Sequence, residues 1–322
     1  MRLFVTGGNG FIGSVVVRAL SARGQTIRCL LRNGSRIDRI RDLPVERVTG
    51  DVRDPASVVA GMQGCDAVLH LAGISRWADI HSPLMEEVTV RGTINVLDSA
   101  EALGRLPVVF VSSTLAVNGS REPAIHDEES SCTLDLDRYV YARAKREAEA
   151  RCRQAAARAL PVVIVNPGEV YGPNDTALVT AGNLVDFAKS STVLVSRGGT
   201  SVVHVDDVSA GIIAALEKGR PGERYILGGE NLTIRQLAEL TLRILGLRKR
   251  IRTVPSWLLR GLAGVASALP VSLPFEPAVV PYATRYWFMD NGKARRELGM
   301  TFRSAEETLA PTLHWLREAG HV

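Results

Sequence analysis

The stretch Met1-Arg-Leu-Phe-Val-Thr-Gly-Gly-Asn-Gly-Phe-Ile-Gly13 decides the fold of this chain. A short apolar run leads into a glycine loop, and helix-like sequence follows the loop. Gly7 suits the tight turn after a strand, Gly10 lets the backbone approach a pyrophosphate, and Gly13 lets the helix pack close to the sheet. Free amides at that helix N-terminus then face the anion. We therefore expect a dinucleotide phosphate site that starts at Thr6.

The bulk composition describes an ordinary globular protein. The chain has 322 residues, of which 46% are hydrophobic and 23% charged, enough for one large domain or two smaller ones. The net charge is +5, but the basic residues are scattered and no basic run carries interleaved aromatic residues. We therefore expect no nucleic-acid partner, and part of the positive charge suits an anionic cofactor.

Cysteine and histidine spacing predicts neither a disulfide framework nor a metal site. The four cysteines lie far apart, without a C-x-x-C pair, at Cys29, Cys65, Cys132 and Cys152. They are typical of reduced thiols in a cytoplasmic protein.

The first strand begins at residue 2, so we expect no signal peptide. The longest apolar segment, Gly261–Phe275, is shorter than the ~20 residues of a membrane span and contains two prolines, so we expect no stable membrane insertion.

Strand-like and helix-like segments alternate up to about Val165. The expected strands are Leu3–Thr6, Thr26–Leu31, Val45–Thr49, Ala67–Leu71, Val108–Ser112 and Val162–Val165. The expected helices are 11–23, 55–62, 83–103 and 138–158, with a short one near 36–41. This alternation predicts a Rossmann-type α/β fold, a doubly wound parallel sheet with helices on both faces. We expect residues 1–166 to bind the nucleotide and carry the catalytic residues. Residues 167–322 would form mainly a smaller substrate lobe, with segments that return to the sheet.

Tyr141-Ala-Arg-Ala-Lys145 is the strongest catalytic pattern. Residues four apart share one face of a helix, so the phenol and the ammonium can point into one site. A lysine near the phenol is expected to lower the pKa of Tyr141 from about 10, which suits a general acid or base. A hydroxyl is expected at the end of the preceding strand. Ser113 is our choice for polarising a carbonyl or alcohol oxygen there, and Thr114 is the alternative.

Together these motifs resemble the extended short-chain dehydrogenases/reductases of the NAD-dependent epimerase/dehydratase type. The nearest branch is similar to the dihydroflavonol-reductase-like and hydroxysteroid-dehydrogenase-like proteins. The matching motifs, in order, are Thr6-Gly-Gly-Asn-Gly-Phe-Ile-Gly13, Gly50-Asp-Val-Arg-Asp54, His70-Leu-Ala-Gly73, Arg91-Gly-Thr-Ile-Asn-Val96, Tyr141-x-x-x-Lys145, Asn166-Pro-Gly-Glu-Val-Tyr-Gly-Pro173 and Val203-His-Val-Asp-Asp-Val208.

The resemblance implies roles for residues around the cofactor. Asp51 would receive the adenine amino group, Val52 would line the adenine, and Lys145 would bind the nicotinamide ribose. Asn95 would support a proton relay from behind the site. The remaining cofactor contacts implied are the loop residues Phe11 and Ile12, the segment Leu71, Ala72 and Gly73 beneath the ribose and phosphates, and Pro167 and Gly168 beside the nicotinamide.

The residue at the end of the second expected strand indicates whether the protein prefers NADP(H) or NAD(H). An acidic residue about 20 positions past the glycine loop would grip the ribose 2′-hydroxyl of NAD. Arg32 stands there instead, and no carboxylate follows until Asp38. A guanidinium pairs well with a 2′-phosphate, so we expect NADP(H) in preference to NAD(H). An Arg32 that stacks on adenine and tolerates both cofactors is the alternative.

Two reactions share this set of residues. A carbonyl reductase, or the reverse dehydrogenase, would release its cofactor, whereas a sugar-nucleotide epimerase or dehydratase would retain it. Dehydratases of the family usually place an acidic residue after the active-site hydroxyl, and here Leu115 and Ala116 follow Thr114. Sugar-nucleotide members tend to carry arginine where this chain has Asn166. Both departures favour the reductase. A non-catalytic NADP-binding sensor is a third reading, which the presence of Tyr141 and Lys145 disfavours.

A hydrophobic carbonyl or alcohol is the expected small-molecule substrate. Ser75 and Trp77 follow the fourth strand and should approach the substrate, while Tyr171 and the segment Trp257–Phe275 could supply apolar cover.

Extended members of the family often dimerise through two helices that correspond here to 83–103 and 138–158. A homodimer and a monomer both stay open. We expect no metal, because no histidine pair has ligand spacing.

Overall fold

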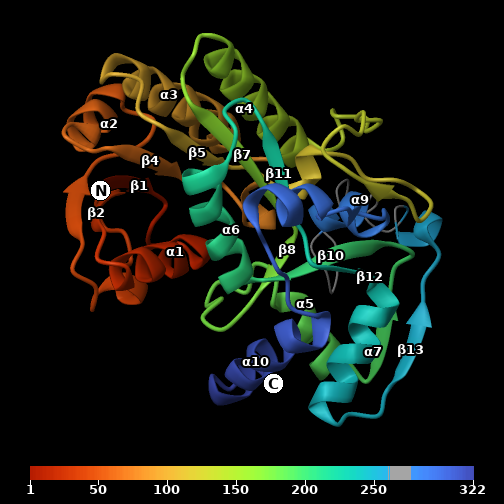
Figure 1. The fold of residues 1–322 in the computed structure, drawn as a ribbon. Helices are drawn as coiled ribbons and strands as arrows, with labels where there is room; N and C mark the ends of the chain where they lie inside the picture. Colours follow the sequence, from red (N-terminus) through yellow and green to blue (C-terminus); the bar gives the residue numbers. More distant parts are fainter. Residues whose placement is uncertain (260, 262–276) are drawn as a thin grey trace.

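A seven-stranded parallel sheet forms the centre of the protein in the computed structural model, which describes residues 1–259, 261 and 277–322 (Figure 1). Its strands, in spatial order, are β11 (Arg224–Leu227), β7 (Val162–Pro167), β5 (Val108–Val111), β4 (Ala67–His70), β1 (Arg2–Thr6), β2 (Thr26–Leu31) and β3 (Glu46–Thr49). The order of connection reverses between β1 and β4. Ligands of such sheets bind outside the carboxyl ends of the strands at this switch point.

Helices cover both faces of the sheet (Figure 1). On one face lie α1 (Phe11–Ala22) and α6 (Val205–Lys218), and on the other lie α2 (Pro55–Met62), α3 (Gly92–Ala102) and α4 (Val140–Ala157). Side chains of β1 alternate between the two faces, as the pleat of a strand requires. Leu3 and Val5 join the core beneath α1 and α6, whereas Phe4 joins the core beneath α2, α3 and α4. The predicted doubly wound fold is confirmed.

Most predicted segment boundaries agree with the structure to within a few residues. The expected helix 83–103 is divided into a π-helical turn, η3 (Met85–Arg91), and α3. Gly92 stands at their junction, where a Cβ atom would lie 2.8 Å from Val52 Cγ2. The missing side chain lets the loop after β3 pack directly on the helix at the carboxyl end of the sheet.

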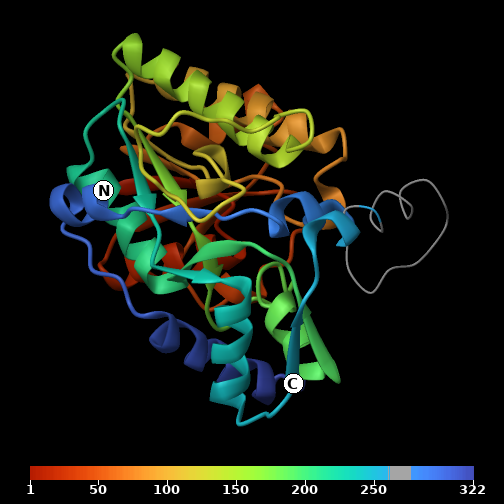
Figure 2. The same ribbon diagram turned by 90° about the vertical axis from the view of Figure 1, so that its right-hand side faces the viewer.

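A second lobe packs below the carboxyl ends of the strands (Figures 1 and 2). It contains the sheet β12-β10-β8, the pair β13-β9 and three helices. Their bounds are β8 Glu169–Tyr171, α5 Gly182–Lys189, β9 Thr192–Val195, β10 Gly199–His204, β12 Glu230–Thr233, α7 Ile234–Leu245, β13 Arg250–Thr253 and α10 Ala305–Glu318. The lobe has its own apolar core, to which α5, α7 and α10 contribute buried leucines.

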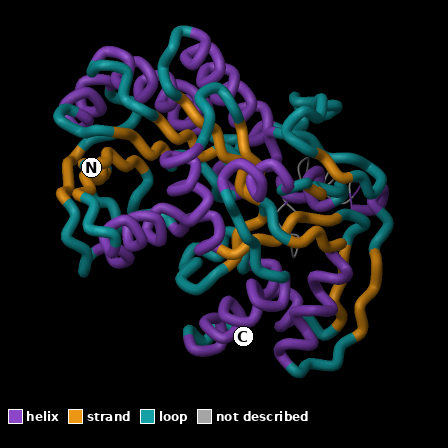
Figure 3. Tube along the Cα trace, viewed as in Figure 1, coloured by secondary structure: helices purple, strands orange, loops and turns teal. Residues whose placement is uncertain are grey.

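Segments after β7 are shared between the lobe and the main sheet. The chain forms β8 to β10 in the lobe, returns through α6, and adds β11 to the edge of the main sheet beside β7. Figure 3 shows the strands of both sheets meeting near the centre of the molecule. The shorter elements are η1 Asp38–Ile40, η2 Trp77–Asp79, η4 Thr114–Ala116, β6 Ile125–His126, η5 Pro277–Val279, α9 Val280–Ala283, β14 Phe288–Met289 and η6 Ala294–Leu298.

The sequence predicted no membrane-spanning helix and an apolar segment at Gly261–Phe275. Among the described residues, no helix combines the length and apolar character that a bilayer crossing requires. The segment Gly261–Phe275 lies outside the described residues except for Gly261. Trp257 and Leu258, just before it, are exposed.

Candidate active site

The glycine loop between β1 and α1 is built by close backbone contacts. Gly7 has φ +72°, and a Cβ there would lie 2.7 Å from Ala72 N. A Cβ on Gly13 would lie 2.1 Å from the Gly7 carbonyl oxygen. The Gly10 amide donates to that same oxygen at 3.0 Å. No side chain caps α1, so its first amides are left for another acceptor, and the arrangement fits a bound pyrophosphate. Phe11 and Ile12 form the first turn of α1 and pack at the edge of the core.

A directed chain of hydrogen bonds fixes the floor of this loop. The Ala72 amide donates to Thr6 Oγ1 (3.2 Å), whose hydroxyl lies 2.6 Å from His70 Nδ1. On the other side of the ring, His70 Nε2 lies 3.1 Å from Thr93 Oγ1, which donates to the Thr89 carbonyl at 2.6 Å. The network assigns the proton to Nε2. Burial and, to a smaller extent, the nearby charge of Lys145 lower the pKa of His70 to about 3, so the ring is a neutral structural group.

A pocket of about 490 Å³ lies at the expected adenine end of the site. It is lined by residues of the loops after β2 and β3, including Arg32 and Asp51. The Arg32 side chain is exposed and pairs with no carboxylate in the described part of the chain, so it is available to an anionic ligand. Hydrogen bonds from Arg53 lower the pKa of Asp51 and keep it charged. Val52 is buried between this loop and α3.

Asn95 on α3 contacts the loop after β3. Its amide Nδ2 donates to the Val52 carbonyl oxygen at 2.8 Å, so it anchors the loop at the adenine end. Gly92, one turn earlier, permits that approach. The expected part of Asn95 in a proton relay stays a prediction.

Tyr141, Ser113 and Lys145 meet at the carboxyl ends of β5 and β7. The side chains of Ser113 and Tyr141 share a hydrogen bond. Lys145 is only 4% exposed, and its Nζ donates to the Val111 carbonyl at 3.0 Å. A Cβ on Gly73 would lie 3.3 Å from the same Nζ, so the ammonium sits directly beneath the loop after β4. Leu71, Ala72 and Gly73 therefore lie between the glycine loop and Lys145. Thr114 is buried at the start of η4, directly after Ser113.

The pKa of Tyr141 differs from the sequence-based expectation. Burial raises it to about 12, and the hydrogen bond from Ser113 opposes the rise. Lys145 does not offset this rise in the pKa of Tyr141, and its Nζ donates to the Val111 carbonyl at the end of β5. Tyr141 is therefore a protonated phenol at neutral pH, the form that a proton donor requires.

An aromatic cluster stands beside Tyr141. Its members are Trp77, Tyr139, Tyr282 and Trp287, with ring centroids 4.9 Å apart for Trp77 and Tyr282 and 5.1 Å apart for Tyr139 and Tyr282. Trp77 lies 6.4 Å from the Tyr141 ring, and the Tyr282 hydroxyl accepts from the Tyr141 amide at 3.2 Å. The sequence singled out Trp77 and missed the other three. Tyr282 and Trp287 lie far from Tyr141 in the sequence, so no local pattern connected them with it. Tyr139 lies only two residues before Tyr141.

Ser75 and Tyr171, both expected to line the pocket, lie in contrasting surroundings. Ser75 is exposed on the loop that leads to η2. Tyr171 is fully buried in the core of the second lobe, where its hydroxyl donates to Glu169 Oε1 at 2.8 Å. Tyr171 therefore packs inside the lobe and does not form the expected cover of a pocket, because β8 turns its side chain toward α5. Asn183 of α5 donates to the same hydroxyl at 2.8 Å.

Pro167 and Gly168 lie where the two sheets meet. The Gly168 amide donates to the Leu227 carbonyl at 3.1 Å, and a Cβ on Gly168 would lie 2.4 Å from the Ser201 carbonyl oxygen. This turn is thus held between β11 and β10. Within the described ranges, no cluster of His, Cys, Asp and Glu has the arrangement of a metal site.

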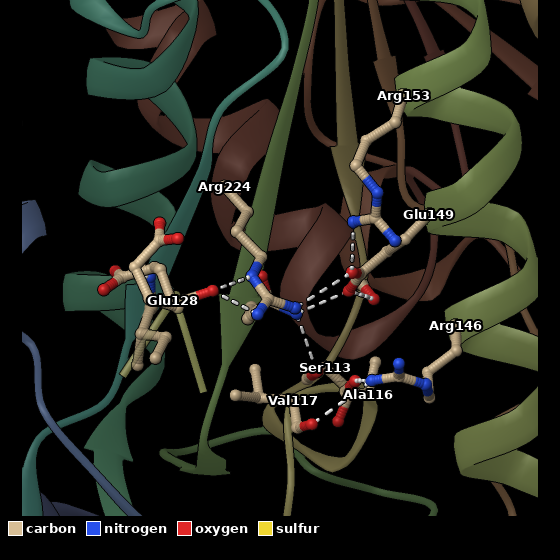
Figure 4. Close-up of polar contacts among 12 residues, drawn as sticks. Ser113, Ala116, Val117, Glu128, Arg146, Glu149, Arg153 and Arg224 are labelled. Carbon is tan, nitrogen blue, oxygen red and sulfur yellow. Dashed lines mark hydrogen bonds and ion pairs between the residues drawn. The ribbon is translucent and has the colours of Figure 1, made fainter. Parts of the chain in front are cut away.

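A buried ionic network behind the site was not anticipated from the sequence. Figure 4 shows Glu149 on α4 and Arg224 on β11 close to Ser113. Glu128, on the loop between β6 and α4, completes this group through its contact with Arg224. Glu149 is one helical turn after Lys145, so the i, i+4 spacing of a carboxylate behind the lysine was the available signal. Arg146 also holds η4, since its Nη1 donates to the Ala116 carbonyl at 2.7 Å (Figure 4).

Comparison with known proteins gives matches over almost the whole chain. Residues 3–228 match the model of the NAD dependent epimerase/dehydratase family. The chain is 30% identical to sterol demethylase protein B of Methylococcus capsulatus, over 100% of both chains. It is 30% identical to the 4-hydroxy-2-methyl-3-oxo-4-farnesyl-3,4-dihydroquinoline-1-oxide ketoreductase of Stigmatella aurantiaca, over 99% of this chain and 97% of the relative. A solved double mutant of dTDP-glucose 4,6-dehydratase from Streptomyces venezuelae, with NAD bound, is 28% identical with a TM-score of 0.78, over 99% and 97% of the two chains.

Proposed function

Because the chain belongs to the NAD-dependent epimerase/dehydratase family and is an NAD(P)-dependent oxidoreductase of the short-chain dehydrogenase/reductase superfamily, we propose that it is an NADPH-dependent reductase of a hydrophobic carbonyl compound. The reverse reaction, dehydrogenation of the alcohol, uses the same groups. The observation that carries the proposal is the protonated Tyr141 phenol, hydrogen-bonded to Ser113 and flanked by Trp77. An aromatic wall and a proton donor together suit an apolar ketone or aldehyde.

Each residue has a defined part in this proposal. The nicotinamide supplies the hydride when the cofactor is bound. Ser113 orients the substrate oxygen, and Tyr141 gives its phenolic proton to that oxygen as negative charge develops there. Lys145 holds the nicotinamide ribose from beneath Gly73, and the turn at Pro167 and Gly168 orients the ring. Leu71, Ala72 and the glycine loop hold the phosphates.

The epimerase or dehydratase reading is the alternative, and two features of the site disfavour it. Leu115 and Ala116 place no carboxylate after Thr114. Asn166 is fully buried, and its Nδ2 donates to the Ser113 carbonyl at 2.8 Å and to Glu149 at 2.7 Å. Asn166 is therefore committed inside the protein and offers no cation to a nucleotide sugar. The names of the relatives agree, since one is a ketoreductase of a farnesylated quinoline oxide and another is a sterol demethylase protein.

The test separates cofactor release from cofactor retention. The purified protein is denatured and its nucleotide content measured, and NADPH oxidation is then followed with hydrophobic ketones and, separately, with nucleotide sugars. We expect little retained cofactor and stoichiometric oxidation with at least one ketone. Tightly retained cofactor, with conversion of a nucleotide sugar and no net oxidation, would support the epimerase instead.

Arg32 is expected to set the preference for NADP(H). A guanidinium that faces a 2′-phosphate contributes a charge-assisted pair, which we expect to favour NADPH over NADH by about tenfold to 100-fold in Kd. Arg32→Gln should remove most of this preference and leave the Kd for NADH within about twofold. Fluorescence titration of both cofactors measures it. Arg36→Gln, on the same loop, is the control, because Arg36 pairs with Asp38. Equal wild-type Kd values for the two cofactors would refute the role of Arg32.

The homodimer stays a prediction. The helices α3 and α4 lie side by side, and a pocket of about 440 Å³ opens on their outer side, lined by Arg91, Asn95, Glu147 and Arg151 among others. Both signs of charge line this surface.

A further inference from the structure

Glu149 is a carboxylate in the interior of the protein, with only 1% of its surface exposed. Placing a charge there is unfavourable unless hydrogen bonds and opposite charges compensate it. Oε1 accepts from Ser112 Oγ at 2.6 Å and from Asn166 Nδ2 at 2.7 Å. Oε2 faces the guanidinium groups of Arg153, at 3.2 Å, and Arg224, at 3.5 Å (Figure 4). Both carboxylate oxygens are therefore occupied by donors from three different elements and from its own helix.

These donors connect Glu149 to the groups that act on the substrate and cofactor. Ser112 is the residue before Ser113, and Asn166 is the residue before Pro167. The Asn166 amide also donates to the Ser113 carbonyl at 2.8 Å. A single carboxylate thus holds the end of β5, which carries the hydroxyl, and the end of β7, which carries the nicotinamide turn. Its own helix carries Tyr141 and Lys145.

Arg224 extends this network to the last strand of the sheet. Its Nε donates to the Glu128 carbonyl oxygen at 2.8 Å, and its Nη2 donates to the same oxygen. The Glu128 carboxylate accepts from the Ile226 amide at 2.8 Å. Arg224 is thereby held in place with its guanidinium facing the Glu149 carboxylate.

The charges around Lys145 explain why a buried carboxylate is useful there. The ammonium lies 5.2 Å from the Phe110 ring centroid and donates to the Val111 carbonyl. Burial lowers the pKa of Lys145 to about 8, and the negative charge of Glu149 opposes that change. The other titratable groups nearby are Tyr141 and Cys152 on α4, whose pKa values burial raises, and His70 on β4, which is neutral. Glu149 is thus the main group that favours the charged form of Lys145.

We propose that Glu149 is a positioning residue of the active site, which keeps Lys145 in its ammonium form and fixes Ser113 and the turn at Pro167 relative to it. The inference rests on the proposed function, because it needs Lys145 to hold the nicotinamide ribose. Glu149 itself transfers neither the hydride nor the proton in the reaction. Its effect is transmitted through Lys145, Ser112 and Asn166.

Glu149→Gln tests the charge while nearly preserving the shape. The amide oxygen can still accept from Ser112 and Asn166, but the negative charge beside Lys145 is gone. Removing it disfavours the ammonium, so Lys145 should lose its proton at a lower pH. NADPH affinity, measured by fluorescence titration across pH, should weaken around pH 8 in the wild type. In the variant the midpoint should lie about one pH unit lower, with a matching fall in kcat for ketone reduction.

Glu147→Gln is the matched control. Glu147 lies on the same helix, but its side chain is 40% exposed and pairs with Arg151 at 3.4 Å. Its variant should keep the wild-type midpoint. If E149Q kept the wild-type midpoint for the pH dependence of NADPH binding, the inference would be overturned, whatever the activity of the variant. A shifted midpoint in a protein that reduces no ketone would instead leave the role of Glu149 intact and reject the proposed reductase activity.

A second variant decides the question if E149Q does not fold, as judged by circular dichroism. Arg153→Gln removes a half-exposed guanidinium that partly neutralises Glu149. Lys145 should then hold its proton to a higher pH, so the midpoint for NADPH binding should move upward, by less than one unit because solvent screens the charge. An unmoved midpoint in folded R153Q would overturn the inference in that case.

Discussion

Tyr141→Phe is expected to lower kcat for ketone reduction by about 10²- to 10⁴-fold, the usual contribution of a positioned proton donor. The substitution removes the phenolic hydroxyl and leaves the ring beside Trp77, so the aromatic wall keeps its shape. The hydrogen bond with Ser113 is lost with the hydroxyl. Because no part of the phenol is expected to contact the cofactor phosphates, the Kd for NADPH should stay within about twofold. Steady-state kinetics and fluorescence titration measure the two quantities.

Tyr225→Phe provides the control for this experiment. Tyr225 is fully buried, and its hydroxyl donates to Glu297 at 2.9 Å, away from the site. Losing that hydroxyl should reduce stability and leave kcat close to the wild-type value. A Tyr141→Phe enzyme with undiminished kcat would show that another group donates the proton.

Gly13→Ala is expected to have the second large effect, on cofactor binding. The new Cβ would stand 2.1 Å from the Gly7 carbonyl oxygen, too close for any contact between these atoms. Either the loop or the start of α1 must move, and forcing a methyl group into packed structure costs about 1–3 kcal/mol. Movement of the loop displaces the amides that face the pyrophosphate. We expect the Kd for NADPH to rise about tenfold to 100-fold, since 1.4 kcal/mol is a factor of ten.

The unfolding temperature should fall together with the affinity, which thermal denaturation with and without NADPH can measure. Gly182→Ala is the matched control. Gly182 is the first residue of α5, and its nearest neighbour to a new Cβ is Leu178 Cβ at an ordinary 3.8 Å. That variant should bind NADPH like the wild type and be no less stable. If Gly13→Ala retained full affinity, the loop would not be the phosphate site.

The glycine loop shows why much of the fold could be predicted from the sequence. A tight turn with positive φ at Gly7, and a helix that passes within 2.1 Å of a carbonyl oxygen at Gly13, are local requirements that only glycine satisfies. Similarly, alternation of buried side chains along β1 follows from the pleat and appears as an apolar run. Such requirements act between residues close in sequence, so the pattern of residue types displays them directly.

The candidate site shows where the sequence was insufficient. The i, i+4 spacing correctly placed Tyr141 and Lys145 on one helix, but it gave the wrong direction for the pKa of Tyr141. Burial dominates the pKa of the phenol, whereas the spacing of residues reveals only a potential neighbour. Asn95 and Tyr171 were also interpreted from their motifs alone. The structure directs Asn95 to the Val52 carbonyl and Tyr171 into the second lobe.

By itself, the sequence determined a doubly wound sheet, a nucleotide loop at its first turn, and a tyrosine and lysine on one helix face. Only the tertiary structure decided which distant groups surround that pair. Arg224 reaches Glu149 from 75 residues away, and Tyr282 reaches Tyr141 from 141 residues away. The reason is physical: the order of strands in the sheet and the return of β11 bring these groups together, and neither is encoded by any local spacing. The charge of Lys145, and hence the working state of the site, depends on that assembly.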